Sequence, residues 1–501
     1  MNSQTLNALP IVVSLELPSD PDGVSGAPAV FRALRSMPGR IWFDSATAAL
    51  DDGLNQDFDP VVRRLSRYSF LSADPVLRCD VFANQADPWG ELARWAKRLP
   101  ATFDPALPPF QGGLAGVVGY EAARWLEPHE LARCADHQND DLPTPAVSLG
   151  VYDFVIAIDH FTDQAWLICQ GFSGDEITGR QPCSPLQRGE RAALRAEQVR
   201  RLLAAEIHEP ETAESDLQSS RGKRMAVQTS SLCSNFSSQD YRNAVADIVR
   251  RIRCGDSFQV NLAQRLTTAA TIESDALYLR LRRANPAPYA GYYDGGAFQV
   301  LSSSPEGFLR LRQRHVETRP IKGTVPRTGD AVADGRLADH LLGSDKDRAE
   351  NIMIVDLMRN DLSRVCQDES VVVSQLCEIE RYQFVQHLVS VVEGDLRADC
   401  DAVDLLRACF PGGSVTGAPK IEAMKTIAEL EPNPRGPYCG SMGYIGCGGF
   451  ADFNILIRTI TATAGRWQIP VGGGITARSN PVDEEAETWA KAQGMLHALP
   501  Q

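Results

Sequence analysis

The chain has 501 residues, of which 43% are hydrophobic and 23% charged, and its formal net charge is -14. This is ordinary globular composition with enough apolar residues for a large core. An acidic chain without a long stripe of Lys and Arg argues against nucleic acid and anionic membranes as partners. No apolar run approaches the ~18 residues of a membrane-spanning helix. The first 20 residues lack the pattern of a secretion signal, so we expect a cytoplasmic protein.

The twelve cysteines are scattered along the chain and form no C-x-x-C pair. The sequence therefore indicates neither a zinc ribbon nor a thioredoxin-type site. Reduced thiols of a cytosolic protein are the simplest interpretation.

Residues 1–175 consist largely of short apolar runs broken by Pro and Gly, such as 10–17 and 147–156. This pattern predicts strands with a few helices. Residues 176–236 are rich in Gln, Ser, Glu and Arg, which predicts a polar linker or insertion. One helix is expected within it, over 189–207, where apolar residues recur at helical spacing.

Strands and helices alternate over residues 237–498. A helix is expected from Ser238, with Ser as N-cap and Gly255 at its end, followed by a strand over 257–268. Neighbouring strands then occur in pairs, 290–294 with 298–305 and 439–446 with 450–463. Strands adjacent in sequence favour antiparallel pairing. We therefore expect an α+β protein rather than a doubly wound parallel sheet.

Two expected helices, 344–365 and 480–499, carry acidic stripes. The stripes consist of Asp347 and Glu350, and of Glu484, Glu487 and Lys491. Residues three or four apart share one helix face. Two such faces can meet around a hard cation such as Mg²⁺, which takes a few carboxylates and keeps water ligands. The alternative, two solvated acidic faces, is the more common reason for this spacing.

Lys322 and Glu306 are candidate catalytic residues. Lys322 lies between Pro320 and Gly323 in a turn-like apolar segment, where desolvation can lower its pKa and make it a nucleophile. Glu306 follows an apolar strand, where burial can raise its pKa and suit a general acid. The alternatives are a surface lysine with a buried stem and a plain turn residue.

Two glycine-rich segments have weaker signals. The run Gly472, Gly473 and Gly474 leaves backbone N–H groups accessible, either as a small anion nest or as a tight turn with positive φ. The segment 410–420 does not fit a phosphate loop, because Ala418 stands where Lys is required. His387 is the only histidine within an apolar run, and a buried core histidine is the simpler interpretation there. The chain has no G-x-S-x-G, H-E-x-x-H or Rossmann motif.

Eight blocks nevertheless occur in a recognisable order. They read SSSPEGF, RPIKGTVPR, DRAENIMIVDLMRNDLSRV, FVQHLVS, FPGGSVTGAPK, PYCGSMGYIG, FNILIRTI and GGGITARSNPVDEEAET. Together they resemble the chorismate-binding domain shared by anthranilate synthase large subunits, isochorismate and salicylate synthases, and aminodeoxychorismate synthase component I. The resemblance covers roughly residues 238–498, and the N-terminal region matches more loosely, in FDSA and GGLAGVVGYEAARWLE.

The resemblance implies an α/β sandwich of two large antiparallel sheets with helices outside and the site between the layers. An N-terminal region (1–175), a linker or insertion (176–236) and a catalytic domain (237–498) are expected. The implied Mg²⁺ ligands are Glu350 and Glu487, with Glu484 in support and Asp347 through water. The metal holds the ring carboxylate of chorismate in this family. The implied substrate-binding residues are Arg458, Tyr438, Lys491 and Gly472–Gly474 at the carboxylates, with His387 and Thr324 lining the site.

Two positions discriminate among members of the family. Water-adding members have a general-base Lys where this chain has Gln259, which argues against isochorismate and salicylate synthases. Anthranilate synthases have Ala where this chain has Lys322, whereas PIKGT is typical of aminodeoxychorismate synthases. A lysine there can add to ring carbon 2 and direct ammonia to carbon 4, with Glu306 as the acid. We therefore expect conversion of chorismate and ammonia to 4-amino-4-deoxychorismate, for 4-aminobenzoate and folate synthesis.

Ammonia requires a source. Cys447 is followed by no His-Glu pair of a glutaminase and is expected in the core, so a separate glutamine amidotransferase subunit is implied. The main alternative is the large subunit of anthranilate synthase, in tryptophan synthesis. Its tryptophan-inhibitor pocket contains Leu-Leu-Glu-Ser, where this chain reads WFDSA with Ser45 retained. We expect no strong feedback by tryptophan, although tryptophan as a structural ligand stays open. A catalytically silent subunit is a further alternative.

Overall fold

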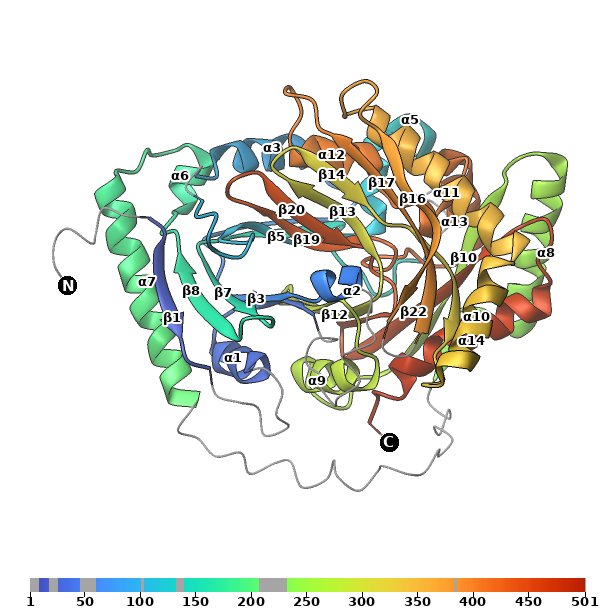
Figure 1. Cartoon of the computed structure of the whole chain (residues 1–501), viewed down its shortest axis with the longest axis horizontal. Helices are drawn as coiled ribbons and strands as arrows, with labels where there is room; N and C mark the ends of the chain where they lie inside the picture. The colour runs from blue at the N-terminus through green and yellow to red at the C-terminus, as the bar shows by residue number, and fades with distance from the viewer. Residues whose placement is uncertain are drawn as a thin grey trace.

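The computed structural model describes residues 9–17, 26–45, 60–100, 103–131, 139–206, 232–382 and 385–500. Its strands form two large antiparallel sheets with helices on their outer sides (Figure 1). This confirms the expected α+β sandwich. No described helix is long and apolar enough to cross a membrane.

The first sheet contains twelve described strands. Along the sheet they are β1 (Ile11–Leu15), β8 (Gln164–Cys169), β7 (Phe154–Asp159), β3 (Tyr68–Ser72), β2 (Ile41–Asp44), β11 (Tyr289–Asp294), β12 (Phe298–Ser304), β21 (Thr459–Thr463), β22 (Arg466–Ile475), β10 (Gln259–Ala269) and β18 (Gly417–Ala418), with β9 (Cys233–Ser234) also paired to β10.

The second sheet contains ten described strands. They are β15 (Ile321–Pro326), β17 (Val385–Asp395), β14 (His315–Thr318), β13 (Gly307–Arg312), β20 (Phe450–Asn454), β19 (Ser441–Gly446), β5 (Gly113–Val118), β6 (Val147–Tyr152) and β4 (Leu77–Val81), with β16 (Val372–Arg381) paired to β17.

The helices follow from local sequence signals. They are α1 (Ala27–Ala33), α2 (Pro60–Leu65), α3 (Trp89–Arg98), α4 (Ala123–Leu126), α5 (Pro128–Leu131), α6 (Gly174–Thr178), α7 (Pro185–Glu206), α8 (Ser238–Cys254), α9 (Ser274–Ala284), α10 (Ala331–Leu342), α11 (Asp345–Ser363), α12 (Ala402–Cys409), α13 (Lys420–Leu430) and α14 (Pro481–Leu496). The cap of α8 is Ser237, one residue before the expected one, and Gly255 ends the helix at φ 94°. Such a left-handed C-terminal residue favours glycine.

The N-terminal and C-terminal parts of the chain share both sheets. In the first sheet Trp42 of β2 is paired with Tyr292 of β11. In the second, Val118 of β5 is paired with Ser441 of β19. The sequence boundaries at 175 and 237 are therefore not boundaries between sheets.

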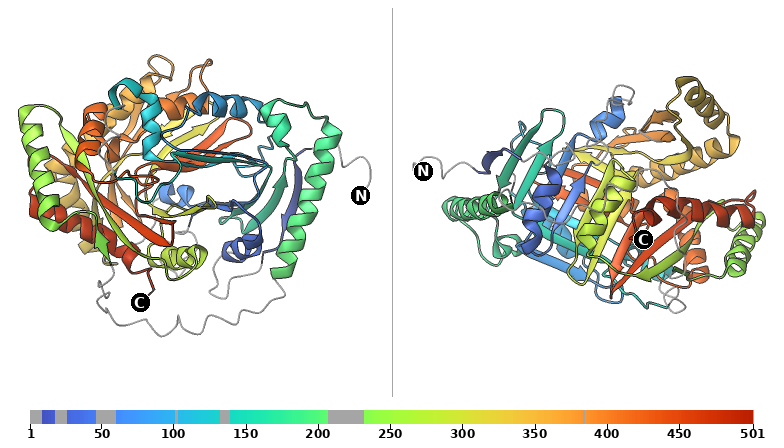
Figure 2. Two further views of the ribbon diagram at one scale, coloured as in Figure 1. Left: turned by 180° about the vertical axis from the view of Figure 1, so that it is seen from behind. Right: turned by 90° about the horizontal axis from the view of Figure 1, so that it is seen from below.

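The helix expected over 189–207 forms as α7, four residues earlier than expected, while Ile207 lies outside the described residues. It packs against β8 and β1 and against α1. Figure 2 shows α7 from behind, covering the N-terminal strands of the first sheet. Residues 185–206 thus belong to the packed body of the protein, and most of the rest of the expected linker, 207–231, is outside the described residues.

Two helices that pack on different sheets bring the acidic stripes together. Helix α11 packs on β17 and β15 of the second sheet, whereas α14 packs on β22 of the first and on α8. Both lie at the same end of the sandwich (Figure 1). Asn480 caps α14 through the N–H groups of Val482 and Asp483, with Pro481 in the first turn, one residue after the expected start of this helix.

Candidate active site

The carboxylates of α11 and α14 face each other. Glu484 of α14 is only 4% exposed, and its Oε1 lies 4.0 Å from Nζ of Lys346 on α11. Burial raises the pKa of Glu350 on α11, and the nearby charges of Asp347 and Glu484 raise it further, against the lowering effect of two lysines. The acidic stripes are thus not two independent solvated faces.

This acidic cluster fits a hard cation that keeps water ligands. Oε1 of Glu350 is buried without a hydrogen-bond partner, which is costly unless a ligand satisfies it. Among the described residues, no three His, Cys, Asp or Glu side chains stand close enough to hold a metal ion by themselves. Mg²⁺ is bound in proteins by one or two carboxylates together with water and substrate oxygens. Glu350 and the α14 carboxylates can therefore hold Mg²⁺ together with an anionic substrate.

Strand β22 lies close beside this cluster. A Cβ atom added to Gly473 would lie 3.3 Å from Oε2 of Glu484, 3.6 Å from Nζ of Lys491 and 3.7 Å from Oε1 of Glu487. Gly472, Gly473 and Gly474 are strand residues, and none has a positive φ. The tight-turn interpretation is wrong for them. Their missing side chains instead let charged groups approach the strand.

Lys491 joins α14 to the same strand. Its Nζ donates to the carbonyl oxygen of Gly472 at 2.8 Å and lies 2.7 Å from Oε1 of Glu487. Burial raises the pKa of Glu487, but Lys491 acts against it by charge and hydrogen bond, so that the net pKa is lowered. Glu487 is therefore ionised at neutral pH and available to a cation.

Lys322 and Glu306 lie near each other and near the acidic cluster. Lys322 is on β15, and its Nζ donates to the carbonyl oxygen of Ser414 at 3.0 Å. Burial lowers the pKa of Lys322, while the charges of Glu350 and Glu306 partly restore it. Glu306 is 5% exposed, and burial raises its pKa. Lys322 is thus not a solvated surface lysine, and Glu306 is not an exposed turn residue.

The remaining candidates surround this pair. Nδ1 of His387 on β17 lies 2.9 Å from the hydroxyl of Thr324 on β15. Burial, reinforced by the charge of Arg458, lowers the pKa of His387 to about 4, so its ring is neutral at pH 7. Arg458 donates to the carbonyl oxygen of Lys491 and interacts electrostatically with the buried Tyr438. A Cβ on Gly323 would lie 3.2 Å from Oδ1 of Asp347, which places Asp347 beside β15.

The structure adds three groups that sequence reasoning did not assign. The carbonyl of Ser414 holds Lys322, and Lys346 faces Glu484. Gln259 is fully buried, and both heteroatoms of its amide lack hydrogen-bond partners. Only Gln259 had a signal in the sequence, as the position that separates water-adding relatives. A carbonyl contact and a helix-to-helix ion pair leave no residue pattern.

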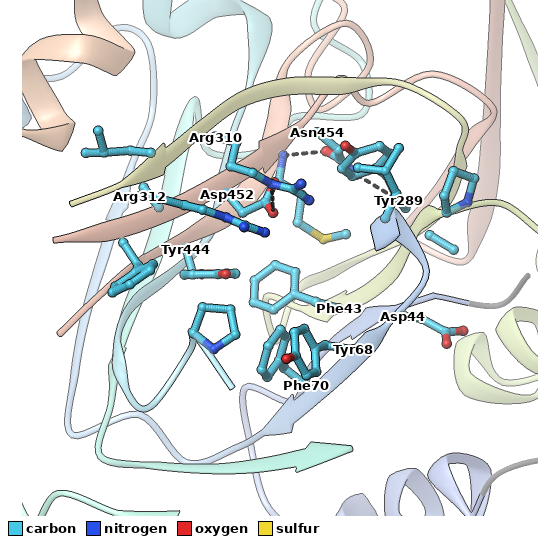
Figure 3. A pocket seen from close by; sticks show the side chains of 18 of the residues that line it. Phe43, Asp44, Tyr68, Phe70, Tyr289, Arg310, Arg312, Tyr444, Asp452 and Asn454 are labelled. Atoms are coloured by element: carbon cyan, nitrogen blue, oxygen red, sulfur yellow. Dashed lines mark hydrogen bonds and ion pairs between the residues drawn. The ribbon is translucent and has the colours of Figure 1, made fainter. Parts of the chain in front are cut away.

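A separate cavity lies between the two sheets, away from this cluster (Figure 3). Aromatic rings of Phe43, Tyr68, Phe70 and Tyr444 line it, and Arg310 is paired with Asp452 on its wall at 2.9 Å. The carboxylate of Asp44, in the FDSA block, is turned away from these rings.

The carboxylate of Asp44 contacts two side chains of α9. Its Oδ2 lies 2.6 Å from Nε of Arg282 and accepts a hydrogen bond from Tyr278 at 3.1 Å. Its Oδ1 accepts from Ser69 at 3.4 Å. Both carboxylate oxygens therefore already have partners within the protein.

A buried acid, a lysine with a lowered pKa, an arginine and facing carboxylates, gathered at one end of an antiparallel sandwich, define an enzyme for an anionic small molecule. The family model of chorismate binding enzymes matches residues 55–497. The chain belongs to this family, and it is a chorismate-utilising enzyme related to the aminodeoxychorismate and anthranilate synthases.

Individual relatives support both kinds of synthase. Aminodeoxychorismate synthase component 1 of Bacillus subtilis is 35% identical over 449 residues, covering 87% of this chain and 90% of that protein. Anthranilate synthase component 1 of Thermus thermophilus is 38% identical over 411 residues, covering 80% of each. The crystal structure of anthranilate synthase component I from Streptococcus pneumoniae TIGR4 matches with a TM-score of 0.70 and 29% identity, over 88% of this chain and 98% of that one.

Proposed function

We propose that this chain is the large subunit of 4-amino-4-deoxychorismate synthase, which converts chorismate and ammonia to 4-amino-4-deoxychorismate for 4-aminobenzoate and folate synthesis. The observation that carries the proposal is Lys322, an amine with a lowered pKa beside the buried acid Glu306. A neutral lysine is a nucleophile, and a protonated carboxyl is a general acid.

In the first half of the reaction Nζ of Lys322 attacks ring carbon 2 of chorismate. Both ring double bonds shift, the bond from carbon 4 to its hydroxyl breaks, and Glu306 supplies the proton with which that hydroxyl leaves as water. In the second half ammonia attacks carbon 4, both ring double bonds return to their original positions, and the bond from carbon 2 to Lys322 breaks. Glu306, now ionised, accepts the proton that ammonia loses.

Opposite shifts of the two pKa values serve this chemistry. Attack requires Lys322 to be neutral while Glu306 is still protonated. A lowered lysine pKa and a raised carboxyl pKa move the two titrations toward each other. The fraction of enzyme in the required state is therefore larger than it is for a solvated Lys and Glu.

The anionic substrate is bound by the groups around this pair. Arg458, Lys491 and the backbone of β22 bind its carboxylates, with Tyr438, His387 and Thr324 lining the site. Glu350 and Glu487, supported by Glu484 and by Asp347 through water, hold Mg²⁺. When bound, Mg²⁺ neutralises the ring carboxylate of chorismate and fixes its position.

Ammonia is supplied by a separate glutamine amidotransferase subunit. The relatives in Bacillus subtilis and Thermus thermophilus are named as component 1 of their synthases, which implies a second component. Cys447 of this chain is 1% exposed, and burial raises its pKa to about 12. Such a thiol is protonated at neutral pH and unsuited to be a glutaminase nucleophile.

Anthranilate synthase component I is the second candidate. The relative in Thermus thermophilus, at 38% identity, favours it. Lys322 argues against it, because a nucleophilic amine on the route to carbon 2 blocks the addition of ammonia there.

Product identity tests the proposal directly. The purified chain is incubated with chorismate, Mg²⁺ and excess ammonium, and the products are separated by chromatography with mass detection. We expect 4-amino-4-deoxychorismate, which added lyase converts to 4-aminobenzoate. Anthranilate as the main product would mean that Lys322 does not direct the addition, and the second candidate would replace the first.

A further inference from the structure

Arg458 has a backbone conformation that few non-glycine residues adopt. Its φ is 52°, in the left-handed region. Such residues persist where the surrounding structure holds them, and they are concentrated at functional sites. Relaxation of this backbone to the usual right-handed or extended region would redirect the guanidinium, which now donates to the carbonyl oxygen of Lys491. The chain must therefore hold residue 458 in place from both sides.

Thr459, the next residue, bridges across Arg458. It is fully buried, and its hydroxyl donates to the carbonyl oxygen of Ile457 at 2.9 Å. The hydroxyl oxygen of Thr459 also lies 2.9 Å from the hydroxyl oxygen of Ser302 on β12. A threonine hydroxyl has one hydrogen, and a carbonyl can only accept. Ser302 is therefore the donor to Thr459, and the two hydroxyls form a directed chain that ends on the residue before Arg458.

Main-chain bonds extend this support. The N–H of Ser303 donates to the carbonyl oxygen of Arg458 at 3.0 Å. The hydroxyl of Ser304 donates to the carbonyl oxygen of Ile455 at 2.6 Å and accepts from the N–H of Glu306 at 3.2 Å. Ser302, Ser303 and Ser304 of the SSSPEGF block thus form hydrogen bonds to three residues between 455 and 459. Ser304 also accepts a hydrogen bond from the backbone of Glu306.

We propose that Thr459, held by Ser302, is a positioning residue that keeps Arg458 in its left-handed conformation and so directs the guanidinium to a carboxylate of the substrate. The inference rests on the proposed role of Arg458 in binding that carboxylate. Thr459 itself does not touch the substrate. The Thr459 hydroxyl is required for this conformation. Without it, the carbonyl of Ile457 loses this donor and the buried hydroxyl of Ser302 loses this acceptor, and both losses favour a rearrangement of residues 457–459.

Steady-state kinetics of chorismate consumption test this on the full chain, with Mg²⁺ and ammonium present. Thr459→Val keeps the side-chain shape and removes the hydroxyl. We expect its KM for chorismate to rise by about 10- to 100-fold, as for a misplaced binding group, with a much smaller change in kcat. A group that binds ground and transition states equally affects KM rather than kcat. Thr459→Ser retains the hydroxyl and is expected to stay near the parent enzyme.

Thr461→Val is the matched control. Thr461 is on the same strand and is 2% exposed, and within the described residues its hydroxyl forms no hydrogen bond to residues 455–459. This variant loses a buried threonine hydroxyl but keeps the hydrogen bond from Thr459 to Ile457. Equal KM values for Thr459→Val and Thr461→Val would overturn the inference.

Two further variants keep the test decisive. If Thr459→Val does not fold, as judged by circular dichroism, Ser302→Ala replaces it. A raised KM then supports the bridge, and an unchanged KM rejects it. Arg458→Ala separates this inference from its premise. An unchanged KM in Arg458→Ala removes the proposed role of Arg458 and with it the inference, whereas a raised KM there and a normal one in Thr459→Val rejects the positioning role alone.

Discussion

Nζ of Lys322 lies 3.0 Å from the carbonyl oxygen of Ser414. The side chain of Ser414 is in turn hydrogen-bonded to Glu306. One residue of the Gly-rich segment after α12 thus contacts both members of the proposed catalytic pair. The lysine and the acid are oriented by the same short loop, which keeps them together without a direct ion pair between them among the described contacts.

Replacement of Lys322 by Ala is expected to reduce the formation of 4-amino-4-deoxychorismate by at least about 100-fold, because the covalent step is lost. Residual turnover is expected to yield anthranilate, since the route to carbon 2 is opened. Mass-detected chromatography measures both products. Lys425→Ala, in an exposed pair with Glu130, is the control. An unchanged product and rate in Lys322→Ala would exclude the nucleophile.

The pH dependence of kcat/KM is expected to be bell-shaped in the parent enzyme. Activity rises with pH as Lys322 loses its proton, and it falls as Glu306 loses the proton that the leaving hydroxyl needs. In Glu306→Gln the second limb is expected to disappear, together with most of the rate. Burial lowers the pKa of Lys322 and raises that of Glu306, so both limbs are expected nearer neutral pH than for solvated groups. A fall at high pH that survives in Glu306→Gln would assign that limb to another group.

The carboxylates of α11 and α14 are expected to set the Mg²⁺ requirement. Glu350→Gln or Glu487→Gln is expected to raise the Mg²⁺ concentration for half-maximal activity by at least about 10-fold, since outer contacts alone are worth that much at metal sites. Glu485→Gln is the control, because Glu485 is on the same helix but pairs with Arg242. An unaltered Mg²⁺ titration in both test variants would remove them from the metal site.

Tryptophan is expected not to inhibit chorismate turnover strongly. The carboxylate of Asp44, in the WFDSA stretch compared above with the inhibitor pocket of anthranilate synthases, has Arg282, Tyr278 and Ser69 as partners. It has no free oxygen for the ammonium group of an amino acid. A titration of activity with tryptophan checks this, and marked inhibition would show that Asp44 is not the group that decides it.

The ion pair between Arg282 and Asp44 is expected to stabilise the fold. The side chains of Arg282 and Asp44 are 7% and 0% exposed. Asp44→Asn leaves a buried charge without its partner, and this costs about 3–5 kcal/mol of unfolding free energy. Urea denaturation measures it. In Glu197→Gln, which removes an exposed pair with Arg201, a loss below about 1 kcal/mol is expected. Equal losses in the two variants would contradict the structural role.

Local patterns predicted the elements that carry the site. Helices α8, α11 and α14 begin within one residue of their expected starts, because side chains next to the helix starts bond the free N–H groups. Adjacent strand pairs such as β11 and β12 also followed from the sequence, since a short connection favours antiparallel pairing. The burial of Lys322 and Glu306 agrees with what the apolar segments around them predict.

Contacts between distant segments did not follow from the sequence. Nothing near Val118 indicates that it is paired with Ser441, because strand register between remote segments is settled by packing of the whole sheet. The glycines of β22 were open to a turn interpretation for the same reason. From the sequence alone, a glycine run can serve either a turn with positive φ or the close approach of side chains, here those of Glu484 and Lys491.

Sharing of the sheets has a consequence for biosynthesis of the chain. Strand β5 leaves the ribosome long before β19, its partner on one side. With about 320 residues between them and synthesis at about 5–20 residues per second, that edge of β5 waits on the order of half a minute for its partner. An apolar strand edge open for that long is a site for wrong pairing. We expect the nascent chain to depend on chaperones, and fragments that end before β19 to aggregate rather than fold.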